Sequence, residues 1–462
     1  MFTFTVHGKQ RGINIKRLIF ISSRILLLTI IVVFSFALPV SAEPETVLTG
    51  CLNKKSGELH NVALGLKPFQ PCAPTETQVT WTSGVPGMES RLIELEQRVA
   101  EMESDHVPLD LTVHCPGESV GDALAQAGNR TAHVTINIVG VCIEEVEINR
   151  DNTRLKGASS GAGLQAPTSN STIINIWRAQ NIGISDLTLT GGAIGIHATE
   201  GALFGAENLI ISGASNVAVS VEFNALGNLF VTSLEGSDLG ILAQSGTVRM
   251  FNGTIESTRE GVLAVQGGHI GLSDGTVIRD CSGHAVSARE GGSISIDRNM
   301  TIENNGFGVS AFSGGHVTVQ RSVIRNNIEG VSVYGGGTIW LRDGVVVANN
   351  QGHGVAGRAG GVLMTSNVII ENNGNDGISL GGGSTADISW GTIVRNNIGH
   401  GIAIGATSSA TFDWKVQVTG NTGTAVICGV KGELDDVALI VGRPGTISGN
   451  GSDTIECPRG FP

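Results

Sequence analysis

Short runs in which apolar and polar residues alternate follow one another from about residue 107 to the end of the chain. In residues 314–334 (GGHVTVQRSVIRNNIEGVSVY) the apolar positions are Val317 and Val319, Val323 and Ile324, and Val331 and Val333. Alternation with a period of two is typical of strands that bury one face. About 23 residues therefore hold three short strands and three turns.

This three-strand pattern repeats with a nearly constant step. One apolar position after a small residue marks each repeat, at Ile196, Val219, Ile241, Val262, Val286, Val309, Val331, Val355, Ile378, Ile402 and Val426. The steps between these positions range from 21 to 24 residues. A fixed period of this length predicts a solenoid, in which equal positions of successive coils stack about 4.8 Å apart.

A column of asparagines accompanies the repeat. Five residues before the marked position, six consecutive repeats carry Asn304, Asn326, Asn350, Asn373, Asn397 and Asn421. Side-chain amides have both donors and acceptors, so stacked asparagines satisfy one another, and we expect this column in a buried turn. Cys281 holds the same position one repeat earlier. We therefore expect it to be a buried, unreactive thiol.

The repeat and its asparagine column resemble the right-handed parallel β-helix of the pectate-lyase-like superfamily, where an Asn ladder marks the turn between the second and third strands. The resemblance covers residues 107–462. It implies an all-β fold, a right-handed parallel β-helix with three-strand coils of about 23 residues. A solenoid has to cap its end coils, and the amphipathic residues 119–127 are predicted to form a helix at the first one.

Composition and cysteine spacing agree with this architecture. Glycine accounts for 66 of 462 residues, and charged residues for only 15 %. So much glycine disfavours a helical bundle, and 40 % apolar residues exclude a disordered chain. Of the seven cysteines six form close pairs, which suggests three local disulfides and an oxidising compartment: Cys51 with Cys72, Cys115 with Cys142, and Cys428 with Cys457.

The first 42 residues are predicted to be a secretory signal peptide. They carry five basic residues and no acidic one, and an apolar run over residues 25–38 precedes the small residues 40–42 (VSA). Cleavage would follow Ala42; the alternatives are an uncleaved anchor helix or a lipid attached at Cys51. Without this segment 24 basic and 41 acidic residues remain, with no basic run. This balance argues against nucleic acid as a partner. The signal peptide predicts a secreted, cell-surface or periplasmic protein.

Two further segments precede the repeats. Residues 43–84 resemble a small Cys-paired module of secreted bacterial and phage-fibre-like proteins, on the basis of Cys51, a K-x-G-x-L turn, Cys72, Glu76 and Trp81. Residues 85–106 form a linker with a short heptad seam: Leu92, Leu95, Val99 and Met102. The seam predicts either a connecting amphipathic helix or a short coiled coil that joins protomers, which would make a homotrimer.

The resemblance implies that the partner is a polysaccharide or a cell-surface glycan. Many members of the superfamily bind or cleave acidic polysaccharides, but the R-x-P-x-x-R motif of pectate lyases is missing and the two G-H-G matches lie in ordinary repeats. Between Val262 and Val426 no repeat exceeds 24 residues, so long loops that would wall a cleft are absent there, while residues 151–260 stay open as a place for a site. We expect a glycan-binding, adhesive or structural protein without an assignable catalytic residue. The alternative is a lyase, hydrolase or epimerase.

Three groups of outward positions are candidates for interaction. On the strand after each glycine pair, the carbohydrate-binding candidates are His269, His316, Trp340 and Asp387. On the third strand, a flat face of small residues is expected from Ser287, Ser310, Ser332, Ala356, Ser379 and Ala403. Two residues before the marked position, acid and imidazole alternate in Glu329, His353, Asp376 and His400. That column is either a structural charge ladder or a weak catalytic candidate able to hold a divalent cation; no other cofactor or metal site is expected.

Overall fold

The computed structural model describes residues 47–56, 58–82, 93–97, 107–128, 131–429 and 438–457. The chain divides into two compact units, residues 1–101 and 102–462. The predicted signal peptide lies outside the described residues, as do Leu92, Val99 and Met102 of the heptad seam, while Leu95 falls in a helical stretch over residues 93–97. Among the helices described, none has the length and apolar character needed to cross a bilayer.

The first unit contains a three-stranded antiparallel sheet. Its central strand β1 (Val47–Asn53) pairs with β2 (Leu59–Leu64) on one side and β3 (Glu76–Thr82) on the other. A disulfide joins Cys51 of β1, which is fully buried, to Cys72 in the loop before β3. The disulfide stands in for a hydrophobic core that so small a sheet does not have.

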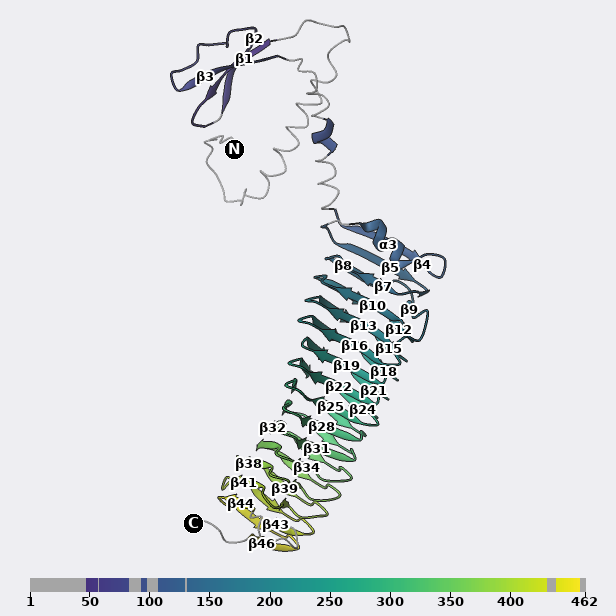
Figure 1. Cartoon of the computed structure of the whole chain (residues 1–462), viewed down its shortest axis with the longest axis vertical. Helices are drawn as coiled ribbons and strands as arrows, with labels where there is room; N and C mark the ends of the chain where they lie inside the picture. Colours follow the sequence, from purple (N-terminus) through teal and green to yellow (C-terminus); the bar gives the residue numbers. More distant parts are fainter. Residues whose placement is uncertain are drawn as a thin grey trace, which may run out of the picture. The chain divides into compact units, whose positions relative to one another are not determined.

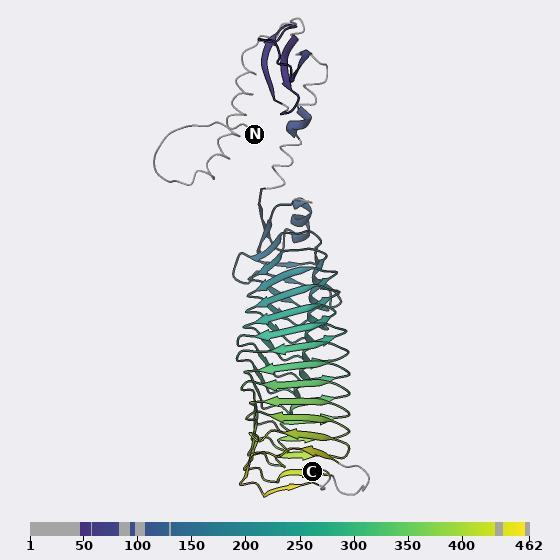
Figure 2. The ribbon, with the colours of Figure 1, turned by 90° about the vertical axis from the view of Figure 1, so that its left-hand side faces the viewer.

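The second unit is a right-handed parallel β-helix whose strands stack as successive rungs (Figures 1 and 2). Each coil contributes one strand to each of three parallel sheets. Sheet 1 contains, among the described residues, β4 (Leu109–His114), β5 (Val134–Val139), β8 (Thr153–Gly157), β11 (Ile182–Ser185), β14 (Leu203–Glu207), β17 (Leu226–Phe230), β20 (Thr247–Phe251), β23 (His269–Ser273), β26 (Ser293–Ile296), β29 (His316–Gln320), β32 (Thr338–Arg342), β35 (Val362–Ser366), β38 (Thr385–Ser389), β41 (Ser409–Phe412) and β44 (Leu439–Val441).

The other two sheets follow in chain order. Sheet 2 has short strands: β6 (Val141–Ile143), β9 (Gly163–Gln165), β12 (Thr188–Thr190), β15 (Ile210–Ser212), β18 (Ser233–Glu235), β21 (Thr254–Glu256), β24 (Val277–Arg279), β27 (Thr301–Glu303), β30 (Val323–Arg325), β33 (Val346–Ala348), β36 (Ile369–Glu371), β39 (Ile393–Arg395), β42 (Gln417–Thr419) and β45 (Thr446–Ser448). Sheet 3 comprises β7 (Val146–Ile148), β10 (Thr172–Trp177), β13 (Ile194–Thr199), β16 (Val217–Glu222), β19 (Leu239–Gln244), β22 (Glu260–Val265), β25 (His284–Ala288), β28 (Phe307–Phe312), β31 (Glu329–Tyr334), β34 (Val355–Arg358), β37 (Ile378–Leu380), β40 (Ile402–Ile404), β43 (Thr424–Cys428) and β46 (Ser452–Glu456).

The core of the β-helix is the stack of inward-pointing apolar side chains from all three sheets. In the coil β29–β30–β31 the fully buried apolar residues are Val317, Val319, Ile324, Val331 and Val333. The registers pair each of them with an equivalent residue one coil away; Val317, for example, lies between Ile294 and Ile339. Alternation in the sequence therefore becomes continuous apolar rows along the solenoid.

The asparagine ladder exists, but two of its members differ from the prediction. It lies between sheets 2 and 3 and consists of Asn305, Asn327, Asn350, Asn373, Asn397, Asn421 and Asn450, each side-chain amide donating to the next side-chain oxygen at 2.9–3.1 Å. Asn304 and Asn326 are exposed instead, at left-handed turn positions with φ of 59° and 57°. In those two coils the turn is one residue shorter, so the neighbouring asparagine enters the ladder.

Both ends of the β-helix are capped. The predicted helix is present as α3 (Val120–Ala127), next to the first strands of the β-helix (Figure 1). Its side chains Val120 and Leu124 are buried and belong to the core. Ser119 caps it by accepting a hydrogen bond from the Asp122 amide. The disulfide between Cys115 and Cys142 closes this end. At the other end Cys428 is bonded to Cys457, next to β46.

Candidate functional site

An open hollow of about 1010 Å³ lies on the outer face of sheet 1, across β5, β8, β11, β14 and β17. We call it the glycine hollow, because Gly183 of β11 and Gly205 of β14 occupy successive positions of one outward row. Arg154 precedes them in the row and Asn228 follows. Two missing side chains in a row between larger residues leave the depression.

The rim of the glycine hollow carries exposed charged and aromatic groups. Arg154 and Lys156 of β8 face Asp186, Glu207 and Phe230 across it. Within the part of the chain that is described, neither Arg154 nor Lys156 takes part in an ion pair, whereas Arg178 nearby is bound to Glu200. Lys156 does act on Asp186, because its charge helps to lower the pKa of that carboxyl. Both cations are exposed and can meet a ligand.

Hydrogen bonds fix the acidic side of the rim. The Asn208 amide donates to Asp186 Oδ1 at 2.8 Å, and this bond is the main reason why the pKa of Asp186 lies below its usual value. Asp186 is consequently a carboxylate and an acceptor for hydroxyl groups. Phe230 is stacked on Phe251 of the next coil, with ring centroids 5.0 Å apart. The rim thus offers positive charge, fixed acceptors and an aromatic surface.

Sequence reasoning missed this hollow because it looked for long loops. The hollow is built without them, from glycines at outward strand positions. Gly183 and Gly205 stand between buried residues, in the sequences I-G-I and F-G-A. A glycine at an outward position of an alternating strand is the sequence signal that would have revealed the hollow. Most of its lining residues fall in the less regular region 151–260, where the sequence left room for a site, and Asp110, Thr135 and Asn137 precede that region.

The predicted carbohydrate-binding residues lie on the same outer face, farther along sheet 1. Trp340 stands between Thr318 and Met364, with Asp387 one coil beyond Met364. His269 and His316 share the adjacent outward row, with Ser293 between them. The structure spreads these residues from β23 to β38 and does not gather them into one cluster.

Two of these side chains are engaged locally. The guanidinium of Arg342 lies 4.2 Å from the Trp340 ring centroid and covers part of it. His269 Nδ1 is 2.9 Å from Ser293 Oγ. Burial lowers the pKa of His269, and Arg249 lowers it further, so that the imidazole is neutral at physiological pH. Trp340 and His269 are therefore parts of a polar surface, and they do not form an acid–base centre.

The acid and imidazole column is present along sheet 3, but its groups make mostly structural contacts. Asp376 Oδ2 is 3.4 Å from His353 Nδ1, while Asp376 Oδ1 accepts the main-chain N–H of His400 at 2.8 Å. His400 Nδ1 in turn accepts the N–H of Thr424 at 3.0 Å. The imidazole of His400 is therefore used as a backbone acceptor and does not face the carboxylate through that nitrogen.

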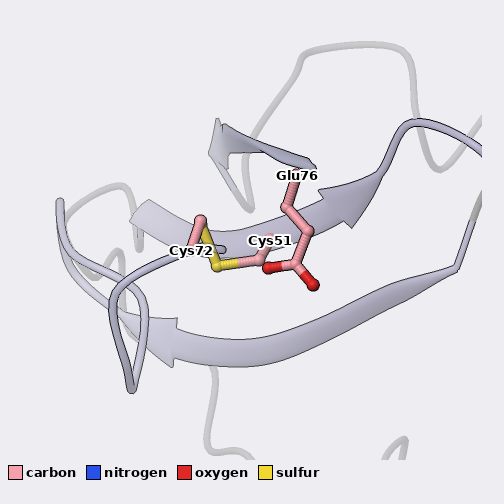
Figure 3. Close-up of side chains that lie close together, drawn as sticks. All are labelled: Cys51, Cys72 and Glu76. Atoms are coloured by element: carbon pink, nitrogen blue, oxygen red, sulfur yellow. A yellow bond between two sulfur atoms is a disulfide. The ribbon is translucent and has the colours of Figure 1, made fainter. Parts of the chain in front are cut away.

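Metal-ligand chemistry has little support in the described residues. They contain one group of three potential ligand atoms within 4.8 Å of one another, in Cys51, Cys72 and Glu76 (Figure 3). The two sulfur atoms are bonded to each other, so neither is a thiolate. Glu76 is held by the Ala73 N–H at 2.8 Å and by His60 Nε2 at 2.8 Å. This trio ties the loop of the small module to its sheet.

The column of small residues on sheet 3 is for the most part not the flat exposed face that the sequence predicted. Ser287, Ser310, Ser332 and Ala356 are buried, whereas Ser379 and Ala403 are partly exposed. Ser287, Ser310 and Ser332 are at most 1 % exposed, although they point outward. Large side chains from the flanking rows cover them: His284 Nδ1 lies 2.8 Å from Ser310 Oγ, and Phe312 stacks on Tyr334 at 4.8 Å. The serines are small, so the longer side chains beside them extend over them and cover them from solvent.

This covered column perturbs several titratable groups. Burial is the main cause of the lowered pKa of His284 and of the raised pKa values of Glu329 and Tyr334. His284 also stacks on Phe307, with centroids 4.6 Å apart. Around these residues, the outer face of sheet 3 is covered by packed side chains that shield the serines from solvent.

Comparison with known proteins agrees with the fold. The sequence family described as "Right handed beta helix region" matches residues 233–367. A comparison with curated proteins finds no match. Among solved structures the chain is similar to the A-module of the Azotobacter vinelandii mannuronan C-5 epimerase AlgE6, with 19 % identity and a TM-score of 0.40 over 71 % of this chain and 93 % of that one.

Two other solved structures are similar in the same way. One is the periplasmic alginate epimerase AlgG, with 15 % identity and a TM-score of 0.30 over 71 % of this chain and 74 % of that one. The other is the tailspike protein of E. coli bacteriophage HK620 in complex with a hexasaccharide, with 10 % identity and a TM-score of 0.34 over 77 % of this chain and 75 % of that one. At these identities the likeness concerns the β-helix fold.

Proposed function

We propose that the protein is a secreted or surface-displayed β-helix protein that binds an acidic polysaccharide along the outer face of sheet 1. The observation that carries the proposal is the glycine hollow, which has two glycines in one outward row and the exposed Arg154 and Lys156 on its rim. In a chain with a net charge of −12, these two cations give the hollow a local positive charge that attracts a sugar carboxylate. Sugar hydroxyls would meet Asp186 and Glu207, and an apolar sugar face would meet Phe230.

A filling substitution tests the hollow directly. Gly205 does not have a left-handed φ, and a Cβ there would meet no atom within 4 Å, so Gly205→Phe fits the backbone and closes the hollow. Gly271→Phe is its matched control, because Gly271 lies in the same outward row on β23, outside the hollow. We expect Gly205→Phe to abolish binding to uronic-acid polymers in calorimetric titration and Gly271→Phe to retain it. Equal binding by both variants would contradict the proposal.

The charges are tested separately. Replacing Arg154 and Lys156 by Ala should weaken binding at low salt by roughly tenfold or more, and the difference should shrink as salt screens the interaction. Arg178→Ala removes a cation that Glu200 already neutralises, so it should have little effect. The same incubations decide between binding and catalysis. New unsaturated ends in the polymer would establish a lyase and new reducing ends a hydrolase, whereas a changed ratio of C-5 epimers without chain cleavage would establish an epimerase.

The homotrimer is a proposal that rests on the heptad seam alone. The column of small residues on sheet 3 adds little to it, because Ser287, Ser310, Ser332 and Ala356 are buried. Light scattering on the mature chain at micromolar concentration should give three times the chain mass if residues 90–104 form a coiled coil. A mass of one chain would contradict it.

A further inference from the structure

Two strongly exposed tryptophans follow successive strands of sheet 1 near its C-terminal end. Trp390 comes directly after β38 and is 64 % exposed; Trp414 follows β41 and is 73 % exposed. The Lys415 ammonium lies 4.0 Å from the Trp390 ring centroid and 5.2 Å from that of Trp414. Tryptophan is usually well buried, so two exposed rings held side by side by one cation form an unusual surface.

The backbone conformation at Trp390 indicates that local stability does not explain a tryptophan at this position. Trp390 has φ of 42°, in the left-handed region that disfavours bulky side chains. In most other coils the same turn position is held by aspartate or asparagine, which tolerate this conformation: Asp186, Asn208, Asn252, Asp274, Asp343 and Asn367. In three others it is held by Val231, Arg298 and Arg321. Trp390 therefore accepts an unfavourable conformation without gaining burial, which is a pattern found at functional positions.

We propose that Trp390, Trp414 and Lys415 form a second saccharide subsite for the acidic polysaccharide, a proposal that rests on the function proposed above. The indole faces offer stacking surfaces for sugar rings, and Lys415 offers a positive charge to a sugar carboxylate. The carboxylate of Asp413, two residues before Lys415, accepts the main-chain N–H of Lys415 at 3.2 Å and is thereby engaged in the turn.

The two subsites lie along one edge of sheet 1. Asp186, Asn208 and Val231 belong to the rim of the glycine hollow and to the same column of turn residues as Trp390. Seven steps of sheet 1 separate β17 from β38, which corresponds to roughly 34 Å. A polymer that is long enough engages both subsites at once, and its second contact becomes intramolecular, whereas a short oligomer engages only one.

The proposal is tested with size-fractionated oligosaccharides of a uronic-acid polymer and the full mature chain. Affinity should rise steeply once the extended oligomer exceeds roughly 34 Å, and Trp390→Asn with Trp414→Ser should remove that rise, at least about tenfold, while short oligomers bind the hollow as before. Trp390→Asn should not lower the melting temperature, since asparagine is a regular residue of this column. Ile398→Asn is the control, a change at a residue 66 % exposed that belongs to another turn.

The outcomes separate this inference from the function on which it rests. If Gly205→Phe abolishes binding but the tryptophan variant binds long and short oligomers like the unchanged protein, the second subsite does not exist. If the unchanged protein binds no acidic polymer, the proposed function fails and the subsite with it. Tryptophan-dependent sedimentation with vesicles of anionic phospholipid, without any effect on saccharides, would also overturn the inference, in favour of a membrane surface.

Discussion

The side-chain amide of Asn327 donates to the side-chain oxygen of Asn350 at 3.1 Å, inside the turn between sheets 2 and 3. The same Asn327 accepts both the main-chain and the side-chain N–H of Asn305 at 2.9 Å. Its neighbour Asn326 is exposed and makes none of these contacts. Two adjacent asparagines therefore have opposite roles.

Replacing Asn327 by Ala should destabilise the β-helix strongly. The change leaves two buried donors of Asn305 without an acceptor, each worth about 1–3 kcal/mol, so the free energy of unfolding should fall by about 2–6 kcal/mol. Asn326→Gly is the matched control, because glycine accepts the left-handed conformation, and it should change stability by less than about 0.5 kcal/mol. Denaturant unfolding measures both, and equal effects would show that the ladder is not a main source of stability.

His284 should make the protein less stable in mild acid. Burial lowers the pKa of His284 below its usual 6.5, with Glu260 acting in the opposite direction, so the unfolded chain takes up a proton that the folded chain refuses. Stability is then lost as the pH falls through 6.5, by about 1.4 kcal/mol for each unit of lowering. His284→Asn should remove that part of the decline in melting temperature between about pH 7 and 5.5, and His316→Asn, at an exposed site, should not.

Glu329 should have an opposite pH dependence. Burial raises the pKa of Glu329 above its usual 4.5, against the influence of Arg358 and His353, so the folded state retains a proton that the unfolded state has lost. That contribution to stability is present in acid and is lost as the pH rises from 4.5 through the raised pKa. Glu329→Gln should therefore raise the melting temperature near neutral pH, and the gain should vanish toward pH 4.5. A gain that is constant across this range would contradict the assignment.

The thiol of Cys281 should be inert in the folded protein. It is 1 % exposed, it lies 3.1 Å from Thr258 Oγ1, and burial raises its pKa. A thiol reagent at mildly alkaline pH should label no cysteine of the folded chain and one per chain in denaturant, because the other six form disulfides. Rapid labelling of the native protein would show that the turn around Cys281 opens readily.

His353 and His400 should act structurally. Replacing both by Gln should leave polysaccharide binding unchanged and alter the melting temperature by only a few degrees, since His353 is beside Asp376 while His400 accepts one backbone hydrogen bond. Titration with zinc, manganese and calcium should shift the melting temperature of neither the unchanged protein nor the double variant. A shift with one ion that the double variant loses would instead assign a divalent-cation site to this column.

The fold was accessible from the sequence because a β-helix repeats one local pattern. Alternation within residues 314–334 defines the three strands, and the 21–24-residue step places equal positions above one another. The asparagine ladder, the capping helix and the three disulfide pairs follow from the same linear spacing. The ladder, the helix and the two disulfides of the β-helix depend on contacts within one coil or between successive coils, which sequence spacing specifies. The Cys51–Cys72 disulfide lies in the small module and joins residues only 21 positions apart, so it is local in sequence as well.

What lies at the surface was decided by the tertiary structure. One residue less in a turn places Asn305 in the ladder where the spacing had suggested Asn304. Ser310 points outward yet is buried, because His284 and Phe312 from flanking rows extend over it. Gly183 and Gly205 form a hollow only because parallel stacking puts them in one row. Exposure depends on the sizes and directions of side chains that meet across coils, and a linear pattern identifies the rows but not how their members fill the space above them.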